Sequence, residues 1–267
     1  MDGPGISNPE AVVAAPATPV PTPCAAVAPD EPSALRSASA HVRFWLVAAG
    51  GLALDLWSKY EAFHLLRQGG SYRLIPGVLE FHTTMNPGAV FGIGAGQTHL
   101  FLGASVLALL VVLWMFAQSP ARRWGLHLAL GAILAGALGN MYDRINIRLV
   151  PYAMPTAAGM YRVYCEPRIS DDGAWIELYE YPPHAGQRPI RIAREGAGDV
   201  PEAVGYVRDF IKISQTWFGG RDVWPWVFNV ADMLLVCGVG VLAIRMLFER
   251  PPQAPPQTVL DGEPRQT

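Results

Sequence analysis

The acidic residues in the apolar parts of this sequence are the first candidates for chemistry. Asp232 lies in a long apolar run and has no basic residue within one helical turn. By contrast, Lys59 follows Asp55 at the i, i+4 spacing of an intrahelical ion pair, and Arg144 directly follows Asp143. Because a charge in an apolar segment is costly, the carboxyl group of Asp232 needs either a partner or a proton.

Asp209 is the candidate partner of Asp232. It lies in Val207–Phe210, and an aromatic stretch that includes Trp224 and Trp226 connects this segment to the last apolar run. Such aromatic residues favour a membrane interface. Two neighbouring carboxyl groups do not readily ionise together, so one keeps a proton, and the pair can act as general base and general acid on a water molecule and a peptide carbonyl. Judged from its own segment alone, Asp209 is more simply interpreted as a solvated loop residue.

The elements that must position these groups are predicted to be membrane-spanning helices. Hydrophobic residues make up 51% of the chain and charged residues 16%, whereas soluble domains carry about 25% charged residues. A span needs about 20 mostly apolar residues. Four stretches qualify, namely residues 42–63, 100–117, 124–142 and 227–248.

Polar residues from three of these spans lie at one level of the bilayer. A helix rises about 1.5 Å per residue, which places the polar residues of the first span about 20–25 Å from its start, near the far edge. Those of the third span lie at its far end, and those of the fourth lie within its first two turns. The residues are Asp55, Lys59, Asn140, Asp143, Arg144, Asn229 and Asp232. Small residues stacked four apart in the third span, such as Gly136 and Ala132 or Gly139 and Ala135, allow these polar ends to converge.

The arginines that flank the spans predict the orientation. Three pairs lie on the same side of a four-span protein: before the first span, between the second and third, and after the fourth. They are Arg36 and Arg43, Arg122 and Arg123, and Arg245 and Arg250. The excess of positive charge on the inner side places both termini in the cytoplasm and the acidic cluster near the outer face. Arg144 and Arg148 lie on the opposite side, beside a long loop where this rule has less force.

Two segments on the outer side have strand patterns. Residues 64–99 contain two strand-like runs on either side of Pro76-Gly77, which predicts a hairpin. Residues 145–226 contain three strand-like runs separated by turn residues. These runs are Tyr161–Glu166, Trp175–Tyr181 and Ile190–Ala193. We therefore expect a small β-rich insert on the outer side.

The two ends of the chain and its cysteines predict no further site. Residues 1–40 are rich in Ala, Pro and Ser and residues 251–267 have the same character, so both are expected to be disordered tails. A net charge of −2 gives no indication of nucleic-acid binding. The three scattered cysteines form no CxxC motif and predict neither a metal site nor a disulfide framework.

Five motifs resemble those of one known family, the bacterial lipoprotein signal peptidases (signal peptidase II). The family patterns are D-x-x-T-K, N-x-G-A-x-F-G, G-A-x-G-N-x-x-D-R, V-x-D-F and F-N-x-A-D, in that order. The matching segments are Asp55–Lys59, Asn86–Gly92, Gly136–Arg144, Val207–Phe210 and Phe228–Asp232. Each motif alone is weak, but all five in order and on the expected spans are highly specific. The resemblance covers about residues 41–250 apart from the insert.

This resemblance implies a membrane all-α fold, with four transmembrane helices, a small periplasmic β cradle and an amphipathic segment on the membrane. It implies an aspartic endopeptidase of the bacterial inner membrane that cleaves a prolipoprotein just before its diacylglyceryl-modified cysteine. The catalytic aspartates would be Asp209 and Asp232. The residues that would bind substrate or support the pair are Asn86, Gly88, Asn140, Arg144 and Asn229, with Asp55, Lys59 and Asp143 in supporting roles. We expect a monomer that contacts membrane lipids and needs no cofactor.

Three departures from the family pattern accompany the resemblance. Ser58 replaces a threonine but keeps the hydroxyl group, and Pro87 is unusual within the second motif. The largest departure is the insert, about residues 147–206, at a connection that is short in the family. Long surface insertions are usually tolerated, so we expect the insert to pack beside or over the cradle.

Other interpretations of the polar residues were weighed. Asp55 and Lys59 could form a simple intrahelical ion pair, Arg144 could extend toward the membrane surface, and Asp143 could orient the bundle without touching substrate. The acids could also relay protons in a proton-coupled transporter. The acids cluster at one edge, however, and four spans without an inverted repeat suit a transporter poorly. An inactive scaffold would leave the acids unexplained.

Overall fold

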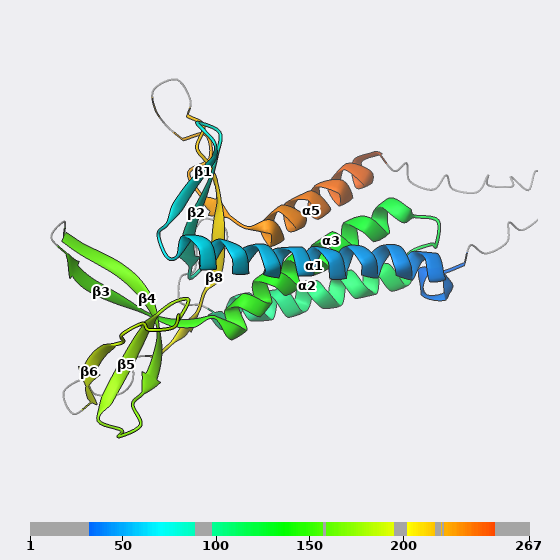
Figure 1. Ribbon diagram of the computed structural model, residues 1–267. Coiled ribbons are helices and arrows are strands. Elements are labelled where there is room, and N and C mark those ends of the chain that lie inside the picture. Colours follow the sequence, from blue (N-terminus) through cyan, green and yellow to red (C-terminus); the bar gives the residue numbers. More distant parts are fainter. Residues whose placement is uncertain are drawn as a thin grey trace, which may run out of the picture. The chain divides into compact units, whose positions relative to one another are not determined.

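In the computed structural model, the structure describes residues 32–88, 98–156, 159–194, 202–216, 220 and 222–248. Four helices lie side by side, with the strands gathered at one end (Figure 1). The helices are α1 (Ala38–Leu66), α2 (Thr98–Gln118), α3 (Trp124–Asn146) and α5 (Val230–Phe248). Most of the two predicted tails lies outside the described residues. The last part of the predicted N-terminal tail is folded, because a short 3-10 helix (Ala34–Arg36) precedes α1.

α3 is the central helix of the bundle and contacts α1, α2 and α5. Its small residues explain how the other helices approach it so closely. A Cβ atom at Gly131 would lie 2.6 Å from the backbone oxygen of Phe44 in α1, and one at Gly136 would overlap the backbone oxygen of Ala231 in α5. The predicted stack of small residues is therefore confirmed as the packing surface of α3.

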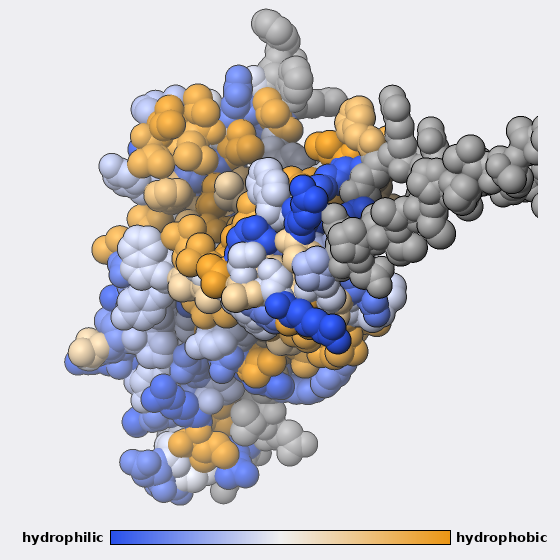
Figure 2. Space-filling model, turned by 90° about the vertical axis from the view of Figure 1, so that its right-hand side faces the viewer, coloured by the Kyte–Doolittle hydropathy of each residue, from blue (hydrophilic) through white to orange (hydrophobic). Residues whose placement is uncertain are grey.

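The helices differ in how well they suit a membrane. Among the described residues, α3 and α5 are long and apolar enough to cross one. α2 contributes a shorter apolar stretch, Leu102–Gln118, and α1 carries Arg43, Asp55, Lys59 and Glu61 within its length. Large apolar side chains nevertheless point outward from α1, α2 and α5. They include Leu46, Trp57, Leu107, Trp114, Val236 and Leu247. Viewed from the end opposite the strands, hydrophilic residues gather at the helix ends with apolar residues around them (Figure 2).

A four-stranded sheet, here called the cradle sheet, covers one end of the bundle. Its strands are β1 (Ser71–Ile75), β2 (Leu79–Asn86), β8 (Val207–Ile213) and β9 (Val227–Phe228), in the order β1-β2-β8-β9. The hairpin predicted around Pro76-Gly77 is confirmed as the antiparallel pair of β1 and β2. The fourth span was predicted to start at Val227, but Val227 and Phe228 pair with β8 and the helix starts at Val230.

The insert, residues 147–206, contains a separate five-stranded sheet, here called the insert sheet. Its strands are β3 (Arg148–Thr156), β4 (Gly159–Ile169), β5 (Trp175–Glu180), β6 (Ile190–Ala193) and β7 (Val204–Gly205), in the order β6-β5-β4-β3-β7. The three predicted strands are confirmed as β4, β5 and β6. β3 was missed because it contains Pro151 and Pro155; both lie beyond its short pairing with β7, on an open edge where proline is tolerated.

The chain leaves and re-enters the bundle at one point, which we call the neck. There Arg148 pairs with Gly205 and Leu149 with Val204, and the backbone N–H of Tyr206 donates to the backbone oxygen of Ile147 over 2.9 Å. A Cβ atom at Gly205 would overlap the backbone oxygen of Arg144, so the returning chain passes directly against the end of α3. The length of the insert therefore does not displace β8, which follows immediately.

Candidate active site

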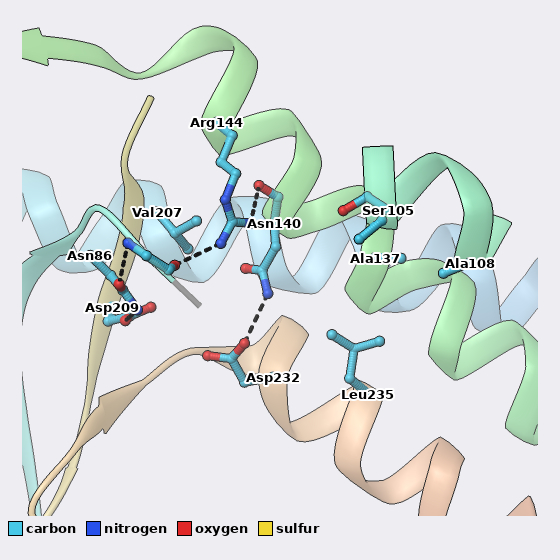
Figure 3. Close-up of a pocket in the computed structure, with 12 residues that line it drawn as sticks. Asn86, Ser105, Ala108, Ala137, Asn140, Arg144, Val207, Asp209, Asp232 and Leu235 are labelled. Carbon is cyan, nitrogen blue, oxygen red and sulfur yellow. Dashed lines mark hydrogen bonds between the residues drawn. The ribbon is translucent and has the colours of Figure 1, made fainter. Parts of the chain in front are cut away.

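The predicted site residues converge at the strand end of the bundle, around a pocket of about 230 Å³. Six of the ten predicted residues line it, namely Asn86, Gly88, Asn140, Arg144, Asp209 and Asp232. The other walls are mostly apolar and come from α2, α3 and α5, with Ala104, Ala108, Ala137 and Leu235. Figure 3 shows Asn86 and Asp209 toward the strands and Ala108 and Leu235 farther along the helices. The remaining four, Asp55, Lys59, Asp143 and Asn229, lie behind this polar wall.

Asp209 lies in the middle of β8, opposite Thr84 of β2, and is buried. Its interpretation as a solvated loop residue is therefore wrong. Asn86 Nδ2 donates to its Oδ2 atom over 3.0 Å, and Asn229 Nδ2 donates to its Oδ1 atom over 2.6 Å. Burial raises the pKa of Asp209 to about 8, with a further rise from the carboxyl group of Asp232, while the two amide hydrogen bonds oppose the rise. Asp209 therefore holds a proton at neutral pH.

Asp232 lies in the first turn of α5 and forms a reciprocal cap with Asn229, the residue before the helix. The backbone N–H of Asp232 donates to Asn229 Oδ1 over 3.0 Å, and the backbone N–H of Asn229 donates to Asp232 Oδ2 over 3.2 Å. This is the geometry of a capping box, which explains the three-residue spacing of the two side chains. The positive end of the α5 helix dipole lies at this terminus, beside the carboxyl group of Asp232.

Two asparagines connect the aspartates through hydrogen bonds. Asn229 Nδ2, which donates to Asp209, also lies 3.2 Å from Asn140 Oδ1, and Asn140 Nδ2 donates to Asp232 Oδ1 over 2.8 Å. The carboxyl groups of Asp209 and Asp232 lie on the same side of Asn140 in the pocket (Figure 3). The predicted partnership thus has a physical connection, although Asp209 comes from a strand and Asp232 from a helix.

Asp55, Lys59 and Asp143 form a buried ionic group beneath the pocket. Lys59 Nζ lies 2.8 Å from Asp55 Oδ2 and 3.4 Å from Asp143 Oδ2, and it donates to Asn140 Oδ1 over 3.2 Å. Asp55 Oδ1 accepts a hydrogen bond from the backbone N–H of Ala231 over 2.8 Å. Lys59 therefore joins three carboxyl and amide groups from α1 and α3, which is more than the intrahelical pair that its spacing alone predicts.

The sequence places Arg144 next to Asp143, but the main partner of Asp143 in the structure is Arg208. Arg208, in β8, donates from Nη2 to Asp143 Oδ1 over 2.7 Å and from its backbone N–H to Asp143 Oδ2 over 3.0 Å. Sequence reasoning missed Arg208. The available signal was a basic residue next to Asp209 in a segment flanked by Val207 and Phe210, because a buried basic residue needs a buried acid. Arg208 and Asp143 together attach β8 to the end of α3.

Arg144 is buried and lies within the pocket, so it does not extend toward the membrane surface. Its Nη2 atom donates to the backbone oxygen of Gly88 over 2.8 Å, and its Nη1 atom donates to the backbone oxygen of Asn140 over 3.3 Å. The backbone N–H of Gly88 in turn donates to Asn86 Oδ1 over 2.9 Å. Arg144 thus fixes the segment that orients Asn86 toward Asp209. The rest of this motif, residues 89–92, lies outside the described residues.

The chemistry available in this pocket is that of two carboxyl groups. In the part of the chain that the structure describes, no three His, Cys, Asp or Glu side chains are grouped so that they could hold a metal ion. A protonated and an ionised carboxyl group beside an apolar cavity can supply an acid and a base to the same water molecule and carbonyl group.

Comparison with known proteins identifies the family. Residues 47–248 match the family model described as signal peptidase (SPase) II. The chain belongs to the signal peptidase II family. A lipoprotein signal peptidase of Rhodopirellula baltica is 32% identical over 207 residues, which are 76% of this chain and 70% of the relative. One from Desulfitobacterium hafniense is 26% identical over 199 residues, 73% of this chain and 89% of the relative.

Membership of the signal peptidase II family confirms the resemblance read from the five motifs. The chain is an aspartic peptidase that removes signal peptides, and the transporter alternative receives no support. A solved bacterial membrane enzyme, determined by the in meso method at 2.3 Å resolution, is also similar. It is 21% identical with a TM-score of 0.49, over 76% of this chain and 85% of that one.

Proposed function

We propose that this protein cleaves diacylglyceryl-modified prolipoproteins just before the lipidated cysteine, with Asp209 and Asp232 as its catalytic pair. The observation that carries the proposal is the placement of both carboxyl groups in one pocket, where they are connected through Asn229 and Asn140. The substrate class is that of the relatives, which are lipoprotein signal peptidases.

The two aspartates take different roles in the proposed reaction. Asp232, at the positive end of α5, is the base that removes a proton from water, and the resulting hydroxide attacks the scissile carbonyl carbon. Asp209, whose raised pKa leaves it protonated at neutral pH, donates its proton to the carbonyl oxygen. When the tetrahedral intermediate collapses, the C–N bond breaks. The proton on Asp232 passes to the leaving amine, and the gem-diol returns a proton to Asp209.

The remaining predicted residues are assigned to support. Asn86, Asn140 and Asn229 orient the two carboxyl groups, and Arg144 with Gly88 holds Asn86 in place. Asp55, Lys59 and Asp143 anchor the helices beneath the pair. The mostly apolar half of the pocket, with Ala104, Ala108, Ala137 and Leu235, would take the apolar part of the substrate.

We further propose that α1, α2, α3 and α5 all cross the bacterial inner membrane. The apolar, outward-facing side chains of α1, α2 and α5 support this arrangement, since they would face lipid. The arginines at the end opposite the strands favour a cytoplasmic location for that end and for both termini. The pocket and both sheets would then lie at the periplasmic face, where a monomer could take a lipid-anchored substrate from the membrane.

The direct test uses the full chain in lipid vesicles with one prolipoprotein in two forms, with and without the diacylglyceryl group. The expected result is cleavage of the modified form alone, with a new N-terminus at the lipidated cysteine in mass spectrometry. Asp209→Asn and Asp232→Asn should leave this substrate intact. Processing at the wild-type rate by either variant would contradict the assignment of the pair. Equal cleavage of both substrate forms would contradict the proposed substrate.

A further inference from the structure

The insert sheet touches the residues on either side of Asp209. Side chains alternate along a strand, so Arg208 and Phe210 point to the opposite face of β8 from Asp209. Asp209 points into the pocket, whereas its two neighbours point toward the insert. The insert is therefore in a position to influence how β8 presents its catalytic side chain.

Tyr181, which directly follows β5 of the insert, contacts Arg208. Arg208 Nη1 donates to the Tyr181 hydroxyl group over 3.4 Å, while the rest of the guanidinium group is held by Asp143. Both Tyr181 and Arg208 are buried. The hydroxyl group thus supports Nη1 of the guanidinium group, while Nε and Nη2 donate to Asp143.

Phe210 belongs to the same hydrophobic cluster as this part of the insert, and its ring lies beside that of Phe81 in β2, with the centroids 5.8 Å apart. The insert contributes Leu149, Tyr181 and Tyr206 to this cluster. The bundle contributes Phe63, whose ring centroid lies 6.2 Å from that of Tyr181. This confirms that the insert packs beside the cradle sheet, and it places Tyr181, which contacts Arg208, in the same cluster as Phe210.

Tyr181 itself is fixed at its backbone. Its N–H donates to the backbone oxygen of Tyr164 over 3.0 Å, and its own backbone oxygen accepts from Gln68 Nε2 over 2.7 Å. Gln68 follows the end of α1 and also makes hydrogen bonds of 2.6 and 2.9 Å to the backbone of Tyr164. Tyr181 therefore contacts β8 from a rigid support that extends back to α1.

We propose that Tyr181 is a positioning residue for the catalytic pair, which fixes Arg208 and Phe210 and thereby the direction in which Asp209 faces Asp232. This inference rests on the proposed role of Asp209. It gives the insert, which lies outside the five motifs, a part in the reaction. A displacement of about 1 Å at a reacting group is enough to reduce a rate about 100-fold, so a support of this kind has a measurable effect.

The experiment compares Tyr181→Phe, which removes only the hydroxyl group, and Tyr181→Ala, which also removes the ring, in the full chain in lipid vesicles. Tyr179→Phe is the matched control, because it removes a hydroxyl group that donates to Glu177 on the same sheet, away from β8. Tyr181→Phe should lower kcat about 3- to 10-fold and Tyr181→Ala about 10- to 100-fold, with KM changed less than twofold. Tyr179→Phe should leave both constants unchanged.

Two further measurements separate positioning from a loss of folded protein. Thermal unfolding gives the folded fraction at the assay temperature, and kcat is expressed per folded molecule. The alkaline limb of the pH profile should also move to lower pH in Tyr181→Ala, because water that enters beside β8 would reduce the desolvation of Asp209. Wild-type kcat and pH profile in both Tyr181 variants would overturn the inference, provided that Asp209→Asn is inactive. An active Asp209→Asn would instead overturn the proposed function.

Discussion

Two sets of carboxyl groups lie at the same end of the bundle, three of them buried and Asp232 half-buried, and the two sets are stabilised in different ways. Asp55 and Asp143 are ion-paired, the first to Lys59 and the second to both Lys59 and Arg208. Asp209 and Asp232 receive hydrogen bonds from asparagine amides and from a backbone N–H group. A neighbouring cation favours the charged form of a carboxyl group, whereas two neighbouring carboxyl groups do not readily ionise together and can share a proton.

This difference in partners separates the structural acids, Asp55 and Asp143, from the reactive acids, Asp209 and Asp232, although all four lie at the same end of the bundle. Removing one partner of a buried ion pair leaves an uncompensated charge and destabilises the fold. Replacing a carboxyl group that is held by amides with another amide leaves a neutral group of similar shape. Changes to the first set should therefore act on stability, and changes to the second on the rate of cleavage.

The largest effect is expected for Asp209→Asn and Asp232→Asn. Loss of a general acid or base should lower the cleavage rate by about 10²–10⁴-fold, while the midpoint of thermal unfolding in detergent stays within a few degrees of the wild type. Quantitative gel analysis of prolipoprotein processing gives the rate. Loss of folded protein in both variants would remove the contrast between the two sets.

The next effect is expected for Lys59→Met, which leaves Asp55 without its cation. The free energy of unfolding should fall by about 3–5 kcal/mol. Lys212→Met is the matched control, since Lys212 is partly exposed on β8 opposite Glu80 and should contribute about 1 kcal/mol or less. Thermal unfolding in lipid or detergent measures both. Equal stability of the two variants would show that the ionic group does not hold the bundle.

A smaller effect is expected for Gly139→Ala in α3. The added Cβ atom would overlap Asp55 Oδ2, which Lys59 holds in place, so the free energy of unfolding should fall by about 1–3 kcal/mol. Gly50→Ala is the control, because a Cβ atom on that helical glycine would meet nothing within 4 Å. It should be neutral or stabilising by up to about 1 kcal/mol. If Gly139→Ala and Gly50→Ala unfold at the same midpoint temperature, this account of the packing at Gly139 is refuted.

The smallest expected effect, counted per pH unit, is a pH dependence that is specific to Asp209 and Asp232, the pair held by amides. The pKa of Asp209 is raised to about 8 in the folded protein, so activity should fall about tenfold per pH unit above pH 8 as the proton is lost. The same shift makes the folded state bind a proton that the unfolded chain releases between about pH 4 and 8. Stability should therefore decrease as pH rises through this range. Activity that stays constant from pH 8 to 10 would contradict the role of Asp209 as the acid.

The sequence was sufficient to place the polar residues of the helices, because residues three or four positions apart are neighbours on a helix. Asp55 and Lys59, and likewise Asn229 and Asp232, are close for local reasons, through an i, i+4 pair and a capping box. The partnership of Asp209 with Asp232 came from depth and from the motif resemblance. Arg208 was missed because its partner, Asp143, lies 65 residues earlier and is reached only when β8 packs on the end of α3.

The strands were predictable where turn residues mark their ends. They were not predictable where they form only by pairing with a strand that the fold brings beside them. Pro76-Gly77 marked the hairpin of β1 and β2. β7 and β9 are two residues each and exist only because β3 and β8 lie beside them. No local pattern specifies such short strands. Because β9 was not predicted, its residues were assigned to the helix, and the predicted start of α5 is three residues too early.

The hydrogen bond from Ala231 to Asp55 has a consequence for the synthesis of the protein. Asp55 lies in α1, and Ala231 lies 176 residues later, in α5. Until α5 emerges from the ribosome, Lys59 is the one partner that the nascent α1 carries within its own next turn. Lys59 is thus a counter-ion that Asp55 has from the time α1 forms, and the hydrogen bond from Ala231 is added only when α5 has been made.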